Sequence, residues 1–239
     1  MNVPHPEQWL VALLLAFYLK DCLLLLRPDE AVLRRGLRGR WQAGFGLRDW
    51  TLRGREPYMC HPLRPFEPVW RVPWLSDPVA AAAPCQVQVP AVLAALRPWV
   101  AGIWLSLFVL LPVCLFMQAP LVLTSAVLTL IYLQIGAALA ITWRARARLE
   151  LDGPRFATLA AEVLACPPYA ANLLRKLSLS LAHRDDLSGA IARWMDEAGQ
   201  SKVRTQCRAR LAAHIAQFDA EDPQVAALTR LRRHFGADD

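Results

Sequence analysis

Residues 98 to 143, 46 in all, contain no Asp, Glu, Lys or Arg, and this uncharged run limits the possible folds more than any other feature of the chain. Its apolar character is interrupted by the short segment Gln118-Ala119-Pro120. A single helix of this length would extend about 69 Å, more than twice the roughly 30 Å of a bilayer's hydrocarbon core. The run therefore predicts a transmembrane helical hairpin over residues 98–143.

A further apolar run, from Trp9 to Leu26, predicts a first transmembrane helix within an N-terminal anchor of residues 1–27. A cleaved secretory signal is the alternative interpretation. Residues 1–8 contain no Lys or Arg, and no small-x-small cleavage site follows the run, so an uncleaved anchor is favoured. The predicted fold class is therefore a mainly α, polytopic membrane protein with three transmembrane helices.

The basic residues predict how these helices are oriented. Lys and Arg near the ends of membrane helices concentrate on the cytoplasmic side. Bases follow the first span and the third span and precede the second, at Arg27, Arg34, Arg35, Arg38, Arg40, Arg97, Arg144, Arg146 and Arg148. We therefore expect a multi-pass protein of the cell inner membrane, with the N-terminus outside and the C-terminus in the cytoplasm.

Residues 28–97 form a predicted cytoplasmic insertion that is rich in Trp and Pro. Alternating residues predict short strands at Trp41–Phe45 and Trp50–Leu52, while the prolines from Pro57 to Pro90 predict extended, irregular chain. A small irregular or β insertion is the expected result.

Residues 144–239 show the pattern of a cytoplasmic helical bundle. The segment repeats a pattern of a capping residue, one apolar stripe and a stop. The predicted helices begin at Asp152, Tyr169, Asp186, Ser201 and Asp222, and two of the predicted stops are Cys166-Pro167-Pro168 and Gly199.

Lys20 and Asp21 are the ionisable residues that this assignment places deepest in the membrane. Charge at that depth is costly, which makes such residues candidates for function. Lys20 can extend its long side chain back toward the interface, and neighbours in a helix sequence point in different directions, so the two side chains do not pair with each other. Two roles stay open: a polar contact with another helix, or a part in moving a proton or ion or in partner recognition.

A set of bases and tryptophans forms a candidate surface for anionic lipid headgroups or for partner proteins. Its members are Arg34, Arg35, Arg38, Arg40, Trp41, Trp50, Lys202, Arg204, Arg208 and Arg210. Nucleic acid attracts the same charge. Attachment to the bilayer favours lipid and protein, so nucleic acid is not an expected partner.

Cys60-His61 is a candidate reactive pair, since a thiol beside an imidazole serves in nucleophilic catalysis and in metal binding. No second Cys or His nearby completes a metal-binding pattern, and a turn at His61-Pro62 is the simpler interpretation. The six cysteines form no CxxC pair, and no phosphate-binding loop or hydrolase motif is present. We therefore assign no catalytic residue, metal or cofactor.

These features predict a membrane-anchored scaffold or accessory subunit of an inner-membrane complex, which binds partner proteins through its cytoplasmic regions. Homo-oligomerisation stays open. The main alternative is an enzyme or transport component that acts on a lipid or lipid-linked substrate at the cytoplasmic face. A membrane-tethered sensor is a third interpretation, although the predicted outer segments are very short.

Overall fold

The computed structural model describes residues 6–36, 39–47, 50–75, 91–181, 187–216, 218 and 223–235. The chain is mainly helical with small antiparallel sheets, as the sequence predicts. It divides into two compact units. Unit 1 comprises Met1–Leu24, Tyr58–Val69 and Val87–Ala182, and unit 2 comprises Leu25–Pro57, Trp70–Gln86 and His183–Asp239.

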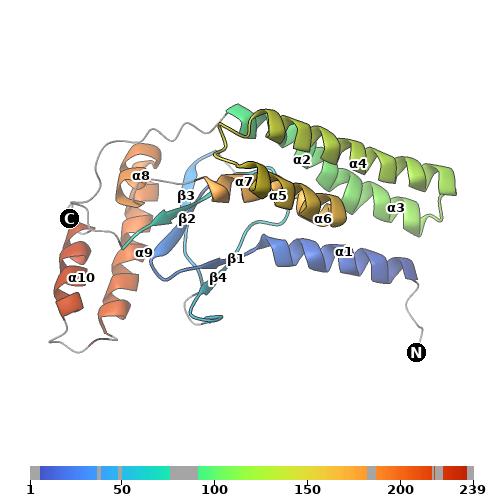
Figure 1. The fold of residues 1–239 in the computed structure, drawn as a ribbon. Helices are drawn as coiled ribbons and strands as arrows, with labels where there is room; N and C mark the ends of the chain where they lie inside the picture. The colour runs from blue at the N-terminus through green and yellow to red at the C-terminus, as the bar shows by residue number, and fades with distance from the viewer. Residues whose placement is uncertain are drawn as a thin grey trace, which may run out of the picture. The chain divides into compact units, whose positions relative to one another are not determined.

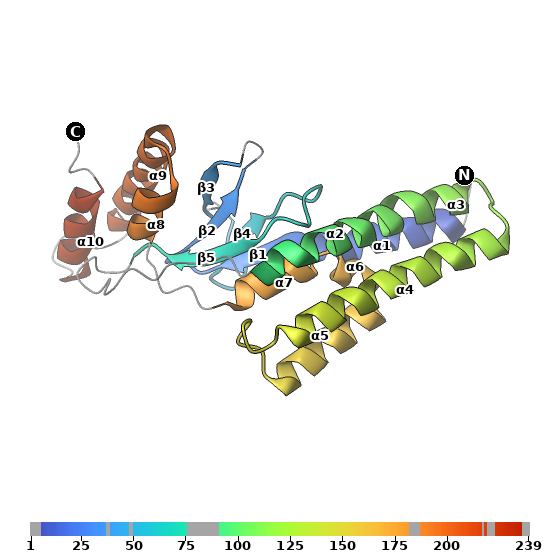
Figure 2. The same cartoon turned by 90° about the horizontal axis from the view of Figure 1, so that it is seen from above.

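A long helical hairpin forms one side of unit 1. Its first arm consists of α2 (Ala91–Leu105), a π-helical turn (Ser106–Leu110) and α3 (Leu111–Phe116), and its second arm is α4 (Leu121–Arg144). Figures 1 and 2 show α2 and α4 running side by side. Both arms are long and apolar enough to cross a membrane, and in an apolar 18-residue stretch of each arm fewer than a third of the residues are buried inside the protein. The predicted break at residues 118–120 is confirmed.

The π-helical turn lies next to Pro112 in the first arm. Proline has no N–H to donate, and its ring crowds the preceding turn of a helix. The structure widens that turn, and the N–H of Leu111 donates to the carbonyl of Ser106. The Ser106 hydroxyl also lies 3.3 Å from Oε1 of Gln134, which links the two arms by a polar contact.

The first apolar run is helical over a shorter range than the sequence predicts. Helix α1 spans Pro6–Cys22, and Leu23–Leu26 form strand β1 instead of a last helical turn. Strand β1 pairs with β4 (Glu56–Met59), and the N–H of Cys60 donates to the carbonyl of Cys22. At 17 residues α1 is slightly short for a membrane-spanning helix, so two helices of the described chain, not three, have the required length.

Three further helices complete unit 1: α5 (Gly153–Ala165), α6 (Pro167–Ala170) and α7 (Leu173–Ser180). The Asp152 carboxylate accepts the N–H of Arg155 at 2.8 Å, which is the predicted cap of α5. The helix predicted from Tyr169 onward is broken at Ala171 and Asn172. This break separates α6 from α7.

Unit 2 contains a three-stranded sheet in the order β3-β2-β5, formed by β3 (Trp41–Gly44), β2 (Glu30–Arg35) and β5 (Val69–Pro73), whose first residue belongs to unit 1. Strands β2 and β3 are antiparallel, and Arg34 lies opposite Gln42. The strand predicted at Trp41 is confirmed. The one predicted at Trp50 is wrong, because only Leu52 pairs there, in an isolated bridge with Arg55.

The helices of unit 2 are α8 (Leu187–Trp194), α9 (Glu197–Ile215) and α10 (Pro223–His234). Gly199 is not a helix stop and Ser201 is not a cap, contrary to the prediction. Asp196 caps α9 instead, and its Oδ1 accepts the N–H of Gly199 at 3.0 Å. The predicted helix starts at Asp186 and Asp222 lie outside the described residues.

Candidate functional site

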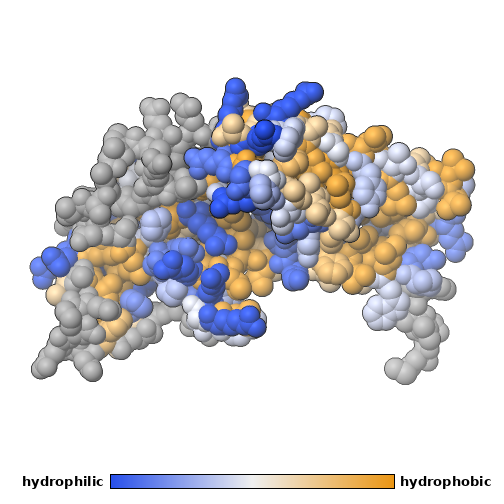
Figure 3. Space-filling view, viewed as in Figure 1, coloured by the Kyte–Doolittle hydropathy of each residue, from blue (hydrophilic) through white to orange (hydrophobic). Residues whose placement is uncertain are grey.

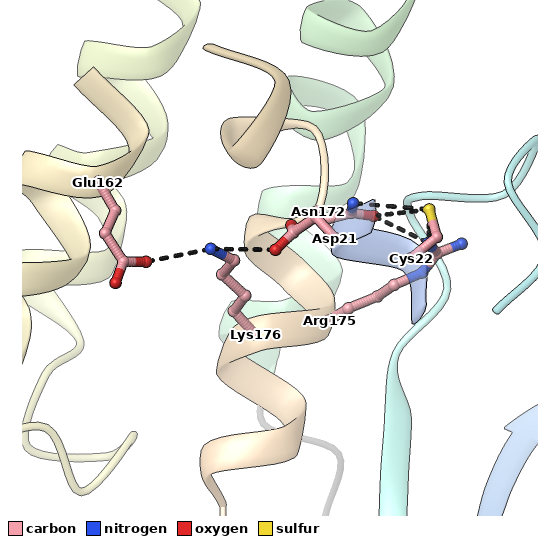
Figure 4. Close-up of polar contacts among 6 residues, drawn as sticks. All are labelled: Asp21, Cys22, Glu162, Asn172, Arg175 and Lys176. Carbon is pink, nitrogen blue, oxygen red and sulfur yellow. Dashed lines mark hydrogen bonds and ion pairs between the residues drawn. The ribbon is translucent and has the colours of Figure 1, made fainter. Parts of the chain in front are cut away.

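Two groups of side chains contain five of the residues that the sequence singles out: Asp21 in the first, and Arg34, Arg40, Trp41 and Lys202 in the second. The first, called here the buried polar cluster, lies in unit 1 and is shown in Figure 4; it consists of Asp21, Cys22, Asn172, Arg175 and Lys176, with the exposed Glu162 at its edge. The second is a cleft in unit 2, called here the basic cleft, whose lining includes Arg34, Arg40, Trp41, Gln42, Asp196 and Lys202.

Arg175 of α7 is the centre of the buried polar cluster and is 3% exposed. Its Nη1 donates to Oδ1 of Asn172 at 2.8 Å and to the sulfur of Cys22 at 3.2 Å. Its Nη2 donates to the backbone carbonyls of His61 and Arg64. No carboxylate forms an ion pair with Arg175 among the described residues. The guanidinium therefore uses neutral acceptors to tie α7 to the end of α1 and to the segment after β4.

Asp21 of α1 pairs with Lys176 of α7, and both side chains are mostly buried. The carboxylate oxygen Oδ1 lies 3.4 Å from the ammonium nitrogen of Lys176, which also lies 3.1 Å from Oε2 of Glu162 in α5. The same ammonium stands 4.4 Å from the centre of the Tyr169 ring. Asp21 therefore contacts another helix by an ion pair, whereas Lys20 is exposed. Figure 4 shows the three charged side chains in a row.

Cys60 and His61 lie where β4 leads into a turn. The Cys60 side chain is buried, and the carbonyl of His61 accepts the N–H of Arg64, which closes the turn at His61-Pro62. The His61 Nδ1 atom accepts the N–H of Leu63 at 3.3 Å. In the described residues no group of three or more His, Cys, Asp and Glu side chains is arranged to hold a metal ion.

The basic cleft brings together bases from two predicted regions of the chain, residues 28–97 and residues 144–239. Arg34 lies in β2, and Lys202 lies in α9. Trp41 is the first residue of β3, and Arg40 directly precedes it. The cleft has a volume of about 350 Å³. The Trp41 ring stacks on Trp194 with centroids 4.8 Å apart, which fixes one wall. Four of the predicted surface residues therefore share one concave site.

The other predicted surface residues lie elsewhere. Arg35 stands over the Trp41 ring, with its guanidinium carbon 5.4 Å from the centroid. Arg210 pairs with Glu56 at 2.7 Å and donates to the carbonyl of Gly46, so its role is internal to unit 2. Trp50 is 63% exposed. Arg204 and Arg208 are half-buried on α9 and do not line the cleft, and Arg38 lies outside the described residues.

Four residues of the buried polar cluster are not predicted from the sequence: Asn172, Arg175, Lys176 and Glu162. A signal was present: residues 172, 175 and 176 have the i, i+3, i+4 spacing that places side chains on one side of a helix, in a segment otherwise rich in Leu. Polar groups at such positions need buried partners. Their partners in α1 are distant in sequence: Cys22 and Asn172 are 150 residues apart. No local pattern in the sequence identifies such partners.

The buried polar cluster joins α1, α5 and α7 by hydrogen bonds and ion pairs. The basic cleft presents positively charged side chains that can bind an anion. No protein-family model, curated protein or solved structure matches this chain.

Proposed function

We propose that this protein is a membrane-anchored scaffold or accessory subunit of an inner-membrane protein complex, and that its cytoplasmic regions bind partner proteins. The membrane part of the proposal is supported by the exposed apolar side chains of α3 and α4. Phe116 is 57% exposed, Leu121 is 81% exposed and Leu133 is 66% exposed. Figure 3 shows hydrophobic residues over the long helices of unit 1. Lipid would cover this apolar surface in the membrane.

The proposal includes α1 as a third span. Its side chains at Trp9, Leu13 and Phe17 are exposed, as expected for contact with lipid. Its 17 residues extend about 26 Å, a few ångströms less than a typical hydrocarbon core, and bilayer thinning can accommodate that difference. The ion pair between Asp21 and Lys176 supports this placement, because pairing lowers the cost of burying a carboxylate near the membrane interface.

The orientation of the proposed spans follows from the bases at their ends, with residues 117–120 outside and unit 2 in the cytoplasm. Cys60 and Cys207 are poor reporters, since both are buried. We therefore propose Met117→Cys, at a residue 75% exposed, and Leu47→Cys, at a residue 64% exposed. A maleimide that cannot cross membranes should label Met117→Cys in intact cells and Leu47→Cys only after permeabilisation. Labelling of Leu47→Cys in intact cells would refute the orientation.

Partner binding is supported by three exposed apolar side chains of unit 2, at Leu47, Trp50 and Leu52, which are 64%, 63% and 46% exposed. A tight turn follows Leu52, where Arg53 and Gly54 both have positive φ, at 53° and 73°. Two such residues form the turn type that suits a two-residue hairpin loop. Exposed apolar patches on soluble surfaces commonly mark protein interaction sites.

The scaffold proposal is tested by affinity purification of the full chain from cell membranes, compared between wild type, Trp50→Ser and Leu63→Ser. Leu63 is 64% exposed and lies in unit 1, so it is the matched control. We expect Trp50→Ser to lose a partner that wild type and Leu63→Ser retain, while the amount of inserted protein stays the same. Equal partner recovery with all three proteins would contradict partner binding through Trp50.

A second candidate function, action on a lipid-linked substrate, is favoured by an apolar cleft of about 290 Å³ in unit 1. Leu151, Leu159 and Leu177 line it together with Glu162 and Lys176. Apolar walls beside charged groups suit an amphipathic molecule. This function would be favoured if Asp21→Asn and His61→Ala each abolished a cellular activity while insertion and complexes stayed intact.

A further inference from the structure

The basic cleft of unit 2 has the charge and the donor groups of an anion site. Three bases, Arg34, Arg40 and Lys202, line it, and Asp196 is the acidic residue among the lining side chains. The three bases come from a strand, a loop and a helix, so the fold brings together residues that are far apart in the sequence. The cleft volume of about 350 Å³ lies at the lower end of the range for small-ligand pockets.

The single acid in the cleft does not neutralise the bases. Oδ1 of Asp196 accepts the N–H of Gly199 as the cap of α9, and Oδ2 lies 3.2 Å from Nη1 of Arg40. The Arg40 and Asp196 side chains are 66% and 45% exposed. Ion pairs with that exposure are weak. Arg40 is therefore able to turn toward a more highly charged anion at small cost, and Arg34 and Lys202 add two further positive charges.

Neutral donors complete the site. Gln42 lies opposite Arg34 in the β2–β3 register, so their side chains project from the same face of the strand pair. The Gln42 side chain is held over Gly36, where a Cβ atom would come within 2.6 Å of it. Gln206 is four residues after Lys202 on α9, which places both on one side of that helix.

We propose that the basic cleft binds a phosphate monoester, presented either by a lipid headgroup or by a free phosphorylated molecule. Arginine binds phosphate through two parallel hydrogen bonds and lysine binds it as a point charge. Both also bind carboxylates, so the preference for a dianionic phosphate rests on its second negative charge, which three bases and one acid attract more strongly than the single charge of a carboxylate. The proposal goes beyond the scaffold function and does not depend on it, because Leu47, Trp50 and Leu52, which support partner binding, do not line the cleft.

The test is isothermal titration calorimetry on the full chain in a nonionic detergent. The probes are sn-glycerol 3-phosphate, dioctanoyl phosphatidic acid and, as the lipid without a net charge, dioctanoyl phosphatidylcholine. We expect both phosphate monoesters to bind. The double variant Arg40→Gln/Lys202→Gln should bind them about 25-fold more weakly, or roughly fivefold for each base.

The matched control is Arg232→Gln/Arg233→Gln, which removes two exposed bases from α10 outside the cleft. We expect it to change the affinity less than about twofold, because exposed charges at a distance are largely screened by salt. Lys202→Arg keeps the charge and should retain binding. Circular dichroism of each variant shows whether the helices are intact.

The two sources of phosphate are distinguished by the ratio of affinities. Tighter binding of dioctanoyl phosphatidic acid supports a lipid headgroup, and equal or tighter binding of sn-glycerol 3-phosphate supports a free phosphorylated molecule. The proposal is overturned if neither monoester binds, if phosphatidylcholine binds as tightly as phosphatidic acid, or if both double variants weaken binding equally. None of these results depends on recovery of a partner protein, so the scaffold function is tested separately.

Discussion

Replacing Arg175 by Met should destabilise unit 1 strongly. Methionine is similar in length to the arginine stem and apolar, so the change removes the guanidinium and keeps much of the packing. Three oxygen acceptors then lose a hydrogen bond from the guanidinium: Oδ1 of Asn172 and the carbonyls of His61 and Arg64, which each keep one backbone N–H donor. The Cys22 sulfur loses a weaker contact.

The expected loss follows from these acceptors. Each lost hydrogen bond contributes about 1 kcal/mol, so the three together contribute about 3 kcal/mol. Removing a buried charge offsets part of this cost, because the guanidinium no longer has to leave water on folding. We therefore expect a net destabilisation of about 2 kcal/mol. Arg175→Lys should be intermediate, since lysine retains the charge and loses the forked geometry.

The assay is thermal unfolding of the full chain in detergent, followed by circular dichroism. For a chain of this length, 1 kcal/mol corresponds to roughly 2 to 4 °C, so Arg175→Met should lower the Tm by about 4 to 8 °C. Arg155→Met is the control, because Arg155 forms an exposed ion pair with Asp152, at 74% and 59% exposure. Exposed pairs contribute little. If the two variants melted at the same temperature, the proposed stabilisation of unit 1 by the Arg175 hydrogen bonds would be refuted.

Three further predictions follow from individual contacts. Asp21→Asn removes the charge that faces Lys176, so it should lower the Tm, whereas Lys20→Gln, at an exposed position beside it, should not. Gly46→Ala should destabilise unit 2 by about 1 to 3 kcal/mol in chemical denaturation, because the added methyl group collides with the Glu56 side chain; an unchanged midpoint would contradict this close contact. Burial raises the pKa of the Cys207 thiol to about 12, so above roughly pH 9 the unfolded chain loses a proton that the folded chain keeps. Stability should therefore fall by at most about 1.4 kcal/mol per pH unit between about pH 9 and 12, and Cys207→Ala should abolish that part of the pH dependence.

Local patterns in the sequence predicted several elements correctly. The uncharged run and its break at residues 118–120 correspond to the two arms that end at Phe116 and begin at Leu121. Asp152 caps α5, and the Cys166-Pro167-Pro168 stop ends it. These features depend on residues within one or two turns of each other, through capping hydrogen bonds, proline geometry and the contrast between apolar and charged segments.

Local patterns failed where a distant segment competed for the backbone. Leu23–Leu26 are apolar enough to continue a helix, yet they form a strand because β4 is available to pair with them. Asp196 and Ser201 both have side chains that cap helices, and the structure uses Asp196. Such choices depend on tertiary packing, which overrides weak local preferences.

The sequence by itself determined which parts of this protein are apolar enough for a membrane and which carry the positive charge. The tertiary structure decided which polar groups meet: Asp21 with Lys176, Cys22 with Arg175, and Arg34 and Arg40 with Lys202 around one cleft. The reason is physical. Hydropathy and charge are properties of the residues themselves, whereas a hydrogen bond or ion pair requires two groups within a few ångströms, and that distance is set by the packing of segments far apart in the chain.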